Sequence, residues 1–179
     1  GPVIDAVQKL VPGKPLRVVV NSHQHFDHSG GLRAAVAAGA TIVTQQANKA
    51  YYDKVFQVRN TIAPDRMAKS GTKPKIVGFK DRHVLTDGTR RIELHRITGG
   101  PHNDSFILAS LPAEKLLIEA DAFTPGPANA APPSPPNANN VNLVDNIERL
   151  KLDVERILPL HGRIVPVGEL YRVTGRVKK

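Results

Sequence analysis

The sequence predicts a protein of the α/β class (α+β in some schemes) on the basis of three observations. Short runs of β-branched and aliphatic residues alternate with helix-forming segments over residues 16–56. A series of short apolar runs over 75–121 predicts successive strands. A group of histidines directly follows the first apolar run. With 179 residues, of which 40% are hydrophobic, the chain suits one domain, 1–179, with its own core.

The first part of the chain predicts an alternation of helices and strands. The expected order is a helix at 3–10 (VIDAVQKL), a strand at 16–20 (LRVVV), a helix at 31–39 (GLRAAVAAG), a strand at 40–45 (ATIVTQ) and a helix at 46–56.

The second part predicts a run of strands and then a helix. The expected strands are 75–79, 83–86, 90–97, 105–111 and 115–121, with Asp87-Gly88 as a hairpin turn. The Pro- and Asn-rich stretch 125–140 cannot build a core, so we expect a long surface loop there. Apolar spacing over 142–158 predicts a helix, and 157–166 returns to the core.

The composition excludes several classes of site. The 25 Lys and Arg outnumber the 16 Asp and Glu, which gives a net charge of +9, but the basic residues are scattered and do not alternate with aromatic residues. We therefore expect a solvated basic surface and not a nucleic-acid site. The absence of cysteine excludes disulfides and thiolate ligands and leaves the cellular compartment open.

The sequence predicts neither a membrane span nor an N-terminal export signal. No apolar run of about 18 residues is present, so we expect no membrane span. No signal peptide is visible, although Gly1-Pro2 is typical of a remnant of protease cleavage, and we therefore expect the native start to be missing.

The stretch SHQHFDHSGG (22–31) places three histidines and one aspartate within six positions. The preceding strand delivers this stretch to the edge of a sheet. His23 and His25 point the same way if the backbone is extended, whereas Asp27 and His28 lie past the bend. Four such side chains at one strand end can serve two neighbouring metal ions, and neutral imidazoles with a carboxylate suit zinc.

The spacing His23-x-His25-x-Asp27-His28 resembles the signature of the metallo-β-lactamase superfamily, and the stretch VVVNSHQHFDHSGGL resembles its strand, metal loop and helix. Three later segments offer the remaining ligands of that family in the right order: His102 in GGPHNDS, Asp121 in LLIEADAF and His161 in ILPLHGR. Asp104 competes with His102, and we assign it an orienting or turn role. We interpret the two remaining histidines, His83 and His95, as ordinary strand residues.

The resemblance implies a division of labour among these residues. His23, His25 and His102 hold one Zn²⁺, whereas Asp27, His28 and His161 hold the second, and Asp121 bridges the two. Zinc is expected in preference to iron or manganese. The implied activity is hydrolysis by a hydroxide that the two metal ions share, with Asp27 as the catalytic residue that orients this nucleophile. Because the chain has no cysteine, the pattern is closer to glyoxalase II and the lactonases than to lactamases with a Cys ligand.

The resemblance does not identify the substrate, because this family acts on many classes of compound. We expect a small-molecule ester, lactone or amide, including a β-lactam. The alternatives are a phosphodiesterase or nuclease of the same fold, a metal-binding fragment with little or no turnover, and, more distantly, a flavodiiron-like redox site that holds iron.

The resemblance also implies that the first sheet of the fold is incomplete. Family members carry a β-rich segment before the metal motif, and here only about 20 residues precede His23. We therefore expect the αββα sandwich of this family to be truncated at its N-terminal sheet. An incomplete sheet exposes unpaired strand edges, so we also expect a homo-oligomer that forms through it.

Overall fold

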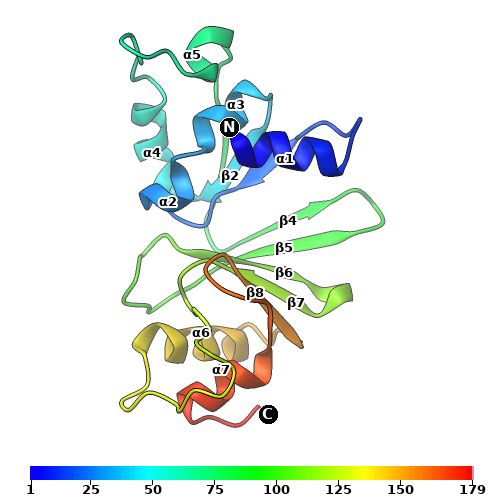
Figure 1. Cartoon of the computed structure of the whole chain (residues 1–179), viewed down its shortest axis with the longest axis vertical. Coiled ribbons are helices and arrows are strands. Elements are labelled where there is room, and N and C mark those ends of the chain that lie inside the picture. Colours follow the sequence, from blue (N-terminus) through cyan, green and yellow to red (C-terminus); the bar gives the residue numbers. More distant parts are fainter. Residues whose placement is uncertain (179) are drawn as a thin grey trace. The chain divides into compact units, whose positions relative to one another are not determined.

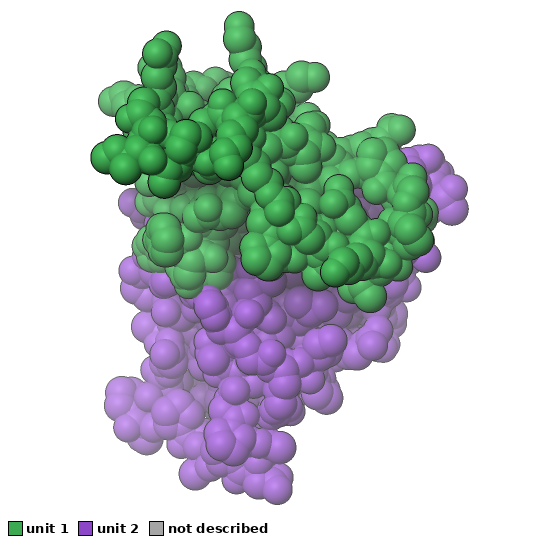
Figure 2. All heavy atoms as spheres, turned by 45° about the horizontal axis from the view of Figure 1, so that its top comes forward, with its two compact units in different colours: residues 1–80 green, residues 81–179 purple. Residues whose placement is uncertain are grey.

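The computed structural model describes residues 1–178, and the chain divides into two compact units, residues 1–80 and 81–179 (Figures 1 and 2). Each unit has its own sheet, its own helices and its own cluster of buried apolar side chains. None of the helices in the described part of the chain has the length and apolar character needed to cross a membrane.

Unit 1 is a parallel α/β unit. Its elements are α1 (Pro2–Leu10), β1 (Val18–Val20), α2 (Phe26–Ser29), α3 (Leu32–Ala37), β2 (Thr41–Gln45), α4 (Gln46–Val55), α5 (Arg66–Ser70) and β3 (Lys75–Phe79). The sheet has the order β1-β2-β3, and both pairs are parallel. Parallel neighbours need crossover connections, which α2 and α3 supply after β1 and α4 and α5 supply after β2. Ile42 of β2 is fully buried among side chains of α3 and α4, including Val36 and Tyr52.

Unit 2 is a mainly antiparallel sheet with two helices. Its elements are β4 (Arg82–Thr86), β5 (Arg91–Arg96), β6 (Ile107–Leu111), the short helix η1 (Pro112–Glu114), β7 (Leu116–Glu119), α6 (Ala138–Arg149), β8 (Arg156–Pro159), β9 (Val165–Pro166) and α7 (Val167–Thr174). The strands follow chain order, and only β7 and β8 pair in parallel, because α6 lies between them in the chain. Leu117, Leu143, Ile157 and Leu170 bring β7, α6, β8 and α7 into one core.

The fold class predicted from the sequence is confirmed: the chain has an α/β fold with two sheets and flanking helices. The first sheet has three strands among the described residues. The expected hairpin at Asp87-Gly88 joins β4 to β5, and Gly88 has a φ of 92°, which suits a residue without Cβ.

The predicted helix at 142–158 was wrong at both ends. Helix α6 begins four residues earlier, at Ala138, because the side chain of Asn137 accepts a hydrogen bond from the backbone N–H of Asn139 (2.8 Å). It ends at Arg149, and Lys151 then adopts a left-handed conformation with a φ of 53°. The following apolar residues belong to β8, which pairs with β7, so strand pairing replaces the helix that the spacing favoured.

The surface loop predicted at 125–140 is correspondingly shorter at its C-terminal end, because its last three residues are helical. Positions 131–138 are all exposed, in agreement with the prediction that the loop carries no core. The sequence did not predict α5 or α7. Helix α5 has only five residues, and α7 follows β9 without an intervening loop.

Candidate metal centre

The metal motif of unit 1 lies between β1 and α3, where the chain makes the short helix α2 (Figure 1). His25 is the residue that precedes α2, with an extended backbone (φ −59°, ψ 148°), so the chain changes direction within the motif. This arrangement puts His23 and His25 before the helix and Asp27 and His28 within it. Gly30 is needed at the end of α2, because a Cβ there would lie 2.9 Å from the carbonyl oxygen of Phe26.

The three imidazole rings of the motif form a cluster. The ring centroid of His23 lies 4.4 Å from that of His25 and 4.6 Å from that of His28. His23 is fully buried, and its Nδ1 lies 3.1 Å from the hydroxyl of Ser22. Nε2 of His28 lies 3.2 Å from Oδ2 of Asp27. Unit 1 therefore gathers four metal-ligating side chains over one short segment.

Asn21 holds the backbone of this segment in place. Its Nδ2 donates hydrogen bonds to the carbonyl oxygens of His23 (2.7 Å) and His28 (3.3 Å). Its Oδ1 accepts hydrogen bonds from the hydroxyls of Thr44 (3.1 Å) and Tyr52 (2.7 Å). Because these groups are buried, their mutual satisfaction makes this conformation of the loop strongly preferred.

Unit 2 brings its three predicted ligands together. His102 lies in the β5–β6 connection, whereas Asp121 and His161 each lie two residues beyond the end of a strand, β7 and β8. Oδ2 of Asp121 lies 3.0 Å from Nε2 of His102, and Oδ1 of Asp121 lies 3.2 Å from Nε2 of His161. One carboxylate therefore lies between two imidazoles and presents a different oxygen to each. The parallel pairing of β7 with β8 explains why the residues after these two strands meet.

The backbone around Asp121 is shaped by the buried carboxylate of Glu119. Its Oε2 accepts hydrogen bonds from the backbone N–H groups of Ala122 (2.8 Å) and Phe123 (3.1 Å), so the chain turns around Asp121. Its Oε1 has no hydrogen-bond partner among the described residues. Burial raises the pKa of Glu119 to about 8, with a smaller contribution from the charge of Asp121, while the two backbone hydrogen bonds oppose the rise.

The connection that carries His102 is fixed to α6 by two asparagines. Asn146 accepts a hydrogen bond from the backbone N–H of Thr98 (3.0 Å) and donates one to the carbonyl oxygen of the same residue (3.1 Å), while Asn142 donates a second to that oxygen (2.8 Å). Gly100 is needed here, because a Cβ would lie 2.6 Å from Oδ1 of Asn142. The ring of His102 lies 5.3 Å from that of the buried Phe106.

Every ligand residue predicted from the sequence thus contacts another predicted ligand of its own unit, through ring contacts in unit 1 and through His–Asp pairs in both units. The two clusters indicate metal binding. Asp104 is not part of the unit 2 ion pairs, and its carbonyl oxygen accepts hydrogen bonds from Arg96 (3.1 and 3.3 Å), consistent with a turn role.

The sequence analysis missed the residues that position the ligands. Asn21 and Glu119 each lie two residues before a predicted ligand, at or near the end of an apolar strand. A polar residue at the end of an otherwise apolar strand is a signal that could have identified both. Asn142 and Asn146 lie on the face of α6 that contacts Thr98, and nothing local marks them as partners of a loop 44 to 48 residues away in the chain.

Comparison with known proteins agrees with this arrangement. Residues 2–161 match the family model of the metallo-beta-lactamase superfamily. No curated protein gave a significant match. Among solved structures, a metallo-beta-lactamase from Pontibacter korlensis is 18% identical, with a TM-score of 0.67 over 97% of this chain and 74% of that one.

Two further structures show the same likeness. A metallo-beta-lactamase from Hirschia baltica has a TM-score of 0.63 at 18% identity, over 99% of this chain and 76% of that one. The rubredoxin oxygen:oxidoreductase of Desulfovibrio gigas has a TM-score of 0.70 at 16% identity, over 98% of this chain but only 47% of that one. At these identities the likeness shows the fold alone. The match to the family model, which spans most of the chain and all seven predicted ligands, shows that this chain belongs to the metallo-beta-lactamase superfamily.

Proposed function

We propose that the protein is a binuclear zinc-dependent hydrolase of small-molecule esters, lactones or amides, with β-lactams among the possible amides. His23, His25 and His102 would hold one zinc ion and Asp27, His28 and His161 the other, with Asp121 shared between them. The observation that carries this proposal is the carboxylate of Asp121, whose two oxygens face the Nε2 atoms of two different histidines at 3.0 and 3.2 Å. A carboxylate that serves two metal ions needs this arrangement.

The donor set fits zinc. The ligands are imidazoles and carboxylates, and the chain has no cysteine to favour a softer thiolate site. The scaffold also supports this choice, because Asn21 and Glu119 orient the backbone on either side of the ligands by buried hydrogen bonds. Partners of this kind usually accompany metal ligands and set their orientation.

Two zinc ions, when bound, would lower the pKa of a water molecule that they share toward neutrality and would polarise the substrate carbonyl. Asp27 would accept a hydrogen bond from the nucleophile and orient it. Its side chain is 57% exposed and lies 3.2 Å from His28, so its carboxylate is open to solvent and fixed at one side.

The surface beside the motif favours a substrate with an apolar group. Phe26 lies between the ligands His25 and Asp27 in the chain, and its side chain is 86% exposed. A large aromatic side chain left in water at this position is suited to contact the apolar part of a substrate. Substitution of Phe26 by Ala is expected to raise KM for aryl esters and to leave kcat nearly unchanged.

Two alternative functions can be distinguished from this proposal by one experiment. A phosphodiesterase or nuclease would agree with the net charge of +9, and a metal-binding protein with little turnover would keep both clusters without catalysis. The test is to load the protein with zinc, remove the excess, and measure metal by elemental analysis together with hydrolysis of an aryl ester, a lactone, a chromogenic cephalosporin and an aryl phosphodiester.

The proposal expects two zinc ions per chain and turnover of at least one carbonyl substrate. His102→Ala should lower zinc content and strongly reduce turnover, whereas His83→Ala, which removes a histidine from β4 outside both clusters, should change neither. One metal ion or none in the loaded protein would overturn the binuclear site. Turnover of the phosphodiester alone would support the phosphodiesterase, iron as the retained metal would support a redox site, and full zinc without turnover would support metal binding alone.

A further inference from the structure

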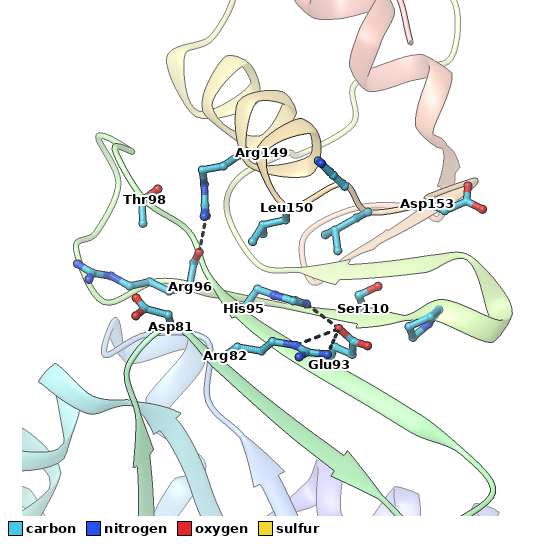
Figure 3. A pocket seen from close by; sticks show the side chains of 13 residues that line it. Asp81, Arg82, Glu93, His95, Arg96, Thr98, Ser110, Arg149, Leu150 and Asp153 are labelled. Carbon is cyan, nitrogen blue, oxygen red and sulfur yellow. Dashed lines mark hydrogen bonds and ion pairs between the residues drawn. The ribbon is translucent and has the colours of Figure 1, made fainter.

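Unit 2 contains a pocket that shares no residue with the proposed metal ligands. It has a volume of about 590 Å³ and lies between the C-terminal end of α6 and the strands β4, β5 and β6 (Figure 3). Volumes of this order are typical of sites for small molecules. The pocket includes His95, one of the two histidines that the metal motif leaves unassigned.

The floor of the pocket is polar and buried. Glu93 and His95 alternate with Leu94 along β5, so both face the pocket while Leu94 lies on the opposite face. The strand register places Ser110 opposite Glu93, and both Ser110 and His95 are about 95% buried or more. Nε2 of His95 lies 3.2 Å from Oε2 of Glu93 without forming a hydrogen bond in the described structure. Burial lowers the pKa of His95, and the neighbouring carboxylate of Glu93 opposes this shift.

The walls of the pocket carry more positive than negative charge. Four cationic side chains line it: Arg82, Arg96, Arg149 and Lys151. Arg82 forms an ion pair with Glu93 (3.0 Å), and Asp153 forms one with Lys115 outside the pocket (3.1 Å). Among the residues that the structure describes, no carboxylate lies within ion-pair distance of the other three cations. Asp81, Glu93 and Asp153 are the three acids of the lining, so its four cations leave a surplus of one positive charge.

Arg149 is held in place but not neutralised. Its Nη2 donates a hydrogen bond to the carbonyl oxygen of Arg96 (3.1 Å; Figure 3) and another to Oδ1 of Asn146 (2.8 Å), and both acceptors are uncharged. Nε and Nη1 have no acceptor in the described part of the chain. The guanidinium is thus held along one edge, while its Nε and Nη1 groups are available as donors. Arginine in this geometry can bind two oxygen atoms of one carboxylate or phosphate group.

We propose that this pocket binds a small molecule through a phosphate group, which Arg149 and Lys151 contact while Ser110 and His95 line the space for the rest of the ligand. A phosphate monoester near pH 7 carries between one and two negative charges and offers three acceptor oxygens, so one group can match the positive surplus of the lining and accept hydrogen bonds from Arg149 and Lys151 together. The proposal does not depend on the metal clusters or on the reaction that they carry out.

The test is a titration of ¹⁵N-labelled, zinc-loaded protein with inorganic phosphate and then with phenyl phosphate at constant ionic strength, with the amide signals of His95 and Ser110 as the readout. Saturable shifts at these amides are expected. Arg149→Gln should weaken phosphate binding about tenfold, because a hydrogen bond between charged groups is lost. Lys151→Gln should weaken binding in the same direction, and it removes an exposed side chain that makes no hydrogen bond or ion pair among the described residues.

Arg156→Gln is the matched control, because Arg156 is an exposed cation of the same unit that does not line the pocket. Unchanged affinity in this variant is expected. Equal weakening in all three variants would overturn the proposal in favour of general charge attraction. Shifts confined to the amides around His102, Asp121 and His161 would overturn it in favour of phosphate at the metal centre. Equal affinity for acetate would overturn the assignment to phosphate.

Discussion

The hydroxyl of Tyr52 in α4 donates a hydrogen bond of 2.7 Å to the side-chain oxygen of Asn21, at the end of β1. The amide of Asn21 in turn holds the carbonyl oxygens of two predicted ligands, His23 and His28. Burial raises the pKa of Tyr52, so its hydroxyl stays protonated at neutral and moderately alkaline pH. A helix outside the metal motif therefore helps to set the backbone that presents the ligands.

The first prediction concerns this contact. Tyr52→Phe removes one buried hydrogen bond and should lower the free energy of unfolding by about 1 kcal/mol. It should also weaken zinc binding, because Asn21 loses one of the two donors that orient its side chain. Urea unfolding and a zinc titration measure the two effects. Tyr51→Phe is the control, because Tyr51 is adjacent in the chain and is 47% exposed. An equal effect in both variants would show that the hydrogen bond of Tyr52 has no specific role.

The second prediction concerns Glu119 as a positioning residue for Asp121. Glu119→Ala leaves the N–H groups of Ala122 and Phe123 without their acceptor and should destabilise the protein by roughly 2 kcal/mol and reduce zinc content. Glu119→Gln keeps an acceptor oxygen at the same place. Rescue of zinc content by Gln but not by Ala would identify the turn as the cause. If Gln fails as badly as Ala, the hydrogen bonds to the turn are not the cause and the positioning role of Glu119 is refuted.

The third prediction concerns acid stability and Asp65. Hydrogen bonding to Arg33 is the main cause that lowers the pKa of Asp65 from 3.8 to about 2, with help from the N–H of Ala68 and from Asn60. Because the folded pKa lies below the unfolded one, this stabilisation is present above about pH 4 and is lost as the pH falls toward 2. The side chain is partly exposed, so solvent screening limits the contribution to about 1 kcal/mol.

Asp65→Asn should therefore lower stability at pH 7 and flatten the loss of stability between pH 4 and 2, as chemical denaturation at several pH values would measure. Asp53→Asn is the control, because Asp53 forms an exposed pair with Lys49 one helical turn away. A pH profile that is the same in the wild type and in Asp65→Asn would show that Asp65 has no such role.

The fourth prediction is that the protein is a homo-oligomer. Strand β1 pairs only with β2 among the described residues, so one edge of the first sheet carries unpaired backbone groups, and Val18–Val20 are half-buried. Val3 and Leu10 of α1 are about 80% exposed and add apolar surface to the same unit. Light scattering at moderate salt, which screens the repulsion of a +9 chain, should give at least twice the chain mass of 19.4 kDa. A monomer at high concentration would refute the prediction.

Local sequence patterns predicted correctly those elements whose tertiary contacts favour the same conformation as the local sequence. The run KIVGF predicts β3 with its observed bounds, and the ligand motif after β1 is evident from four side chains within six positions. The family resemblance supplied His102, Asp121 and His161, which are dispersed along the chain and have no local signature of their own. Asp121 and His161 each follow a strand by two residues, as their position after an apolar run predicted, whereas His102 lies in the middle of the β5–β6 connection and not at a strand end.

The sequence by itself determined the α/β class, most of the strands and the identity of the His and Asp side chains, because these depend on short-range spacing and on residue chemistry. The tertiary structure decided where α6 stops, because the pairing of β8 with β7 outweighs the helical spacing of 150–158. It also decided that one carboxylate lies between His102 and His161, and that Asn21 and Glu119 hold the ligand-bearing turns. Such contacts join residues far apart in the chain, and their energies depend on burial, which no local pattern of residues contains.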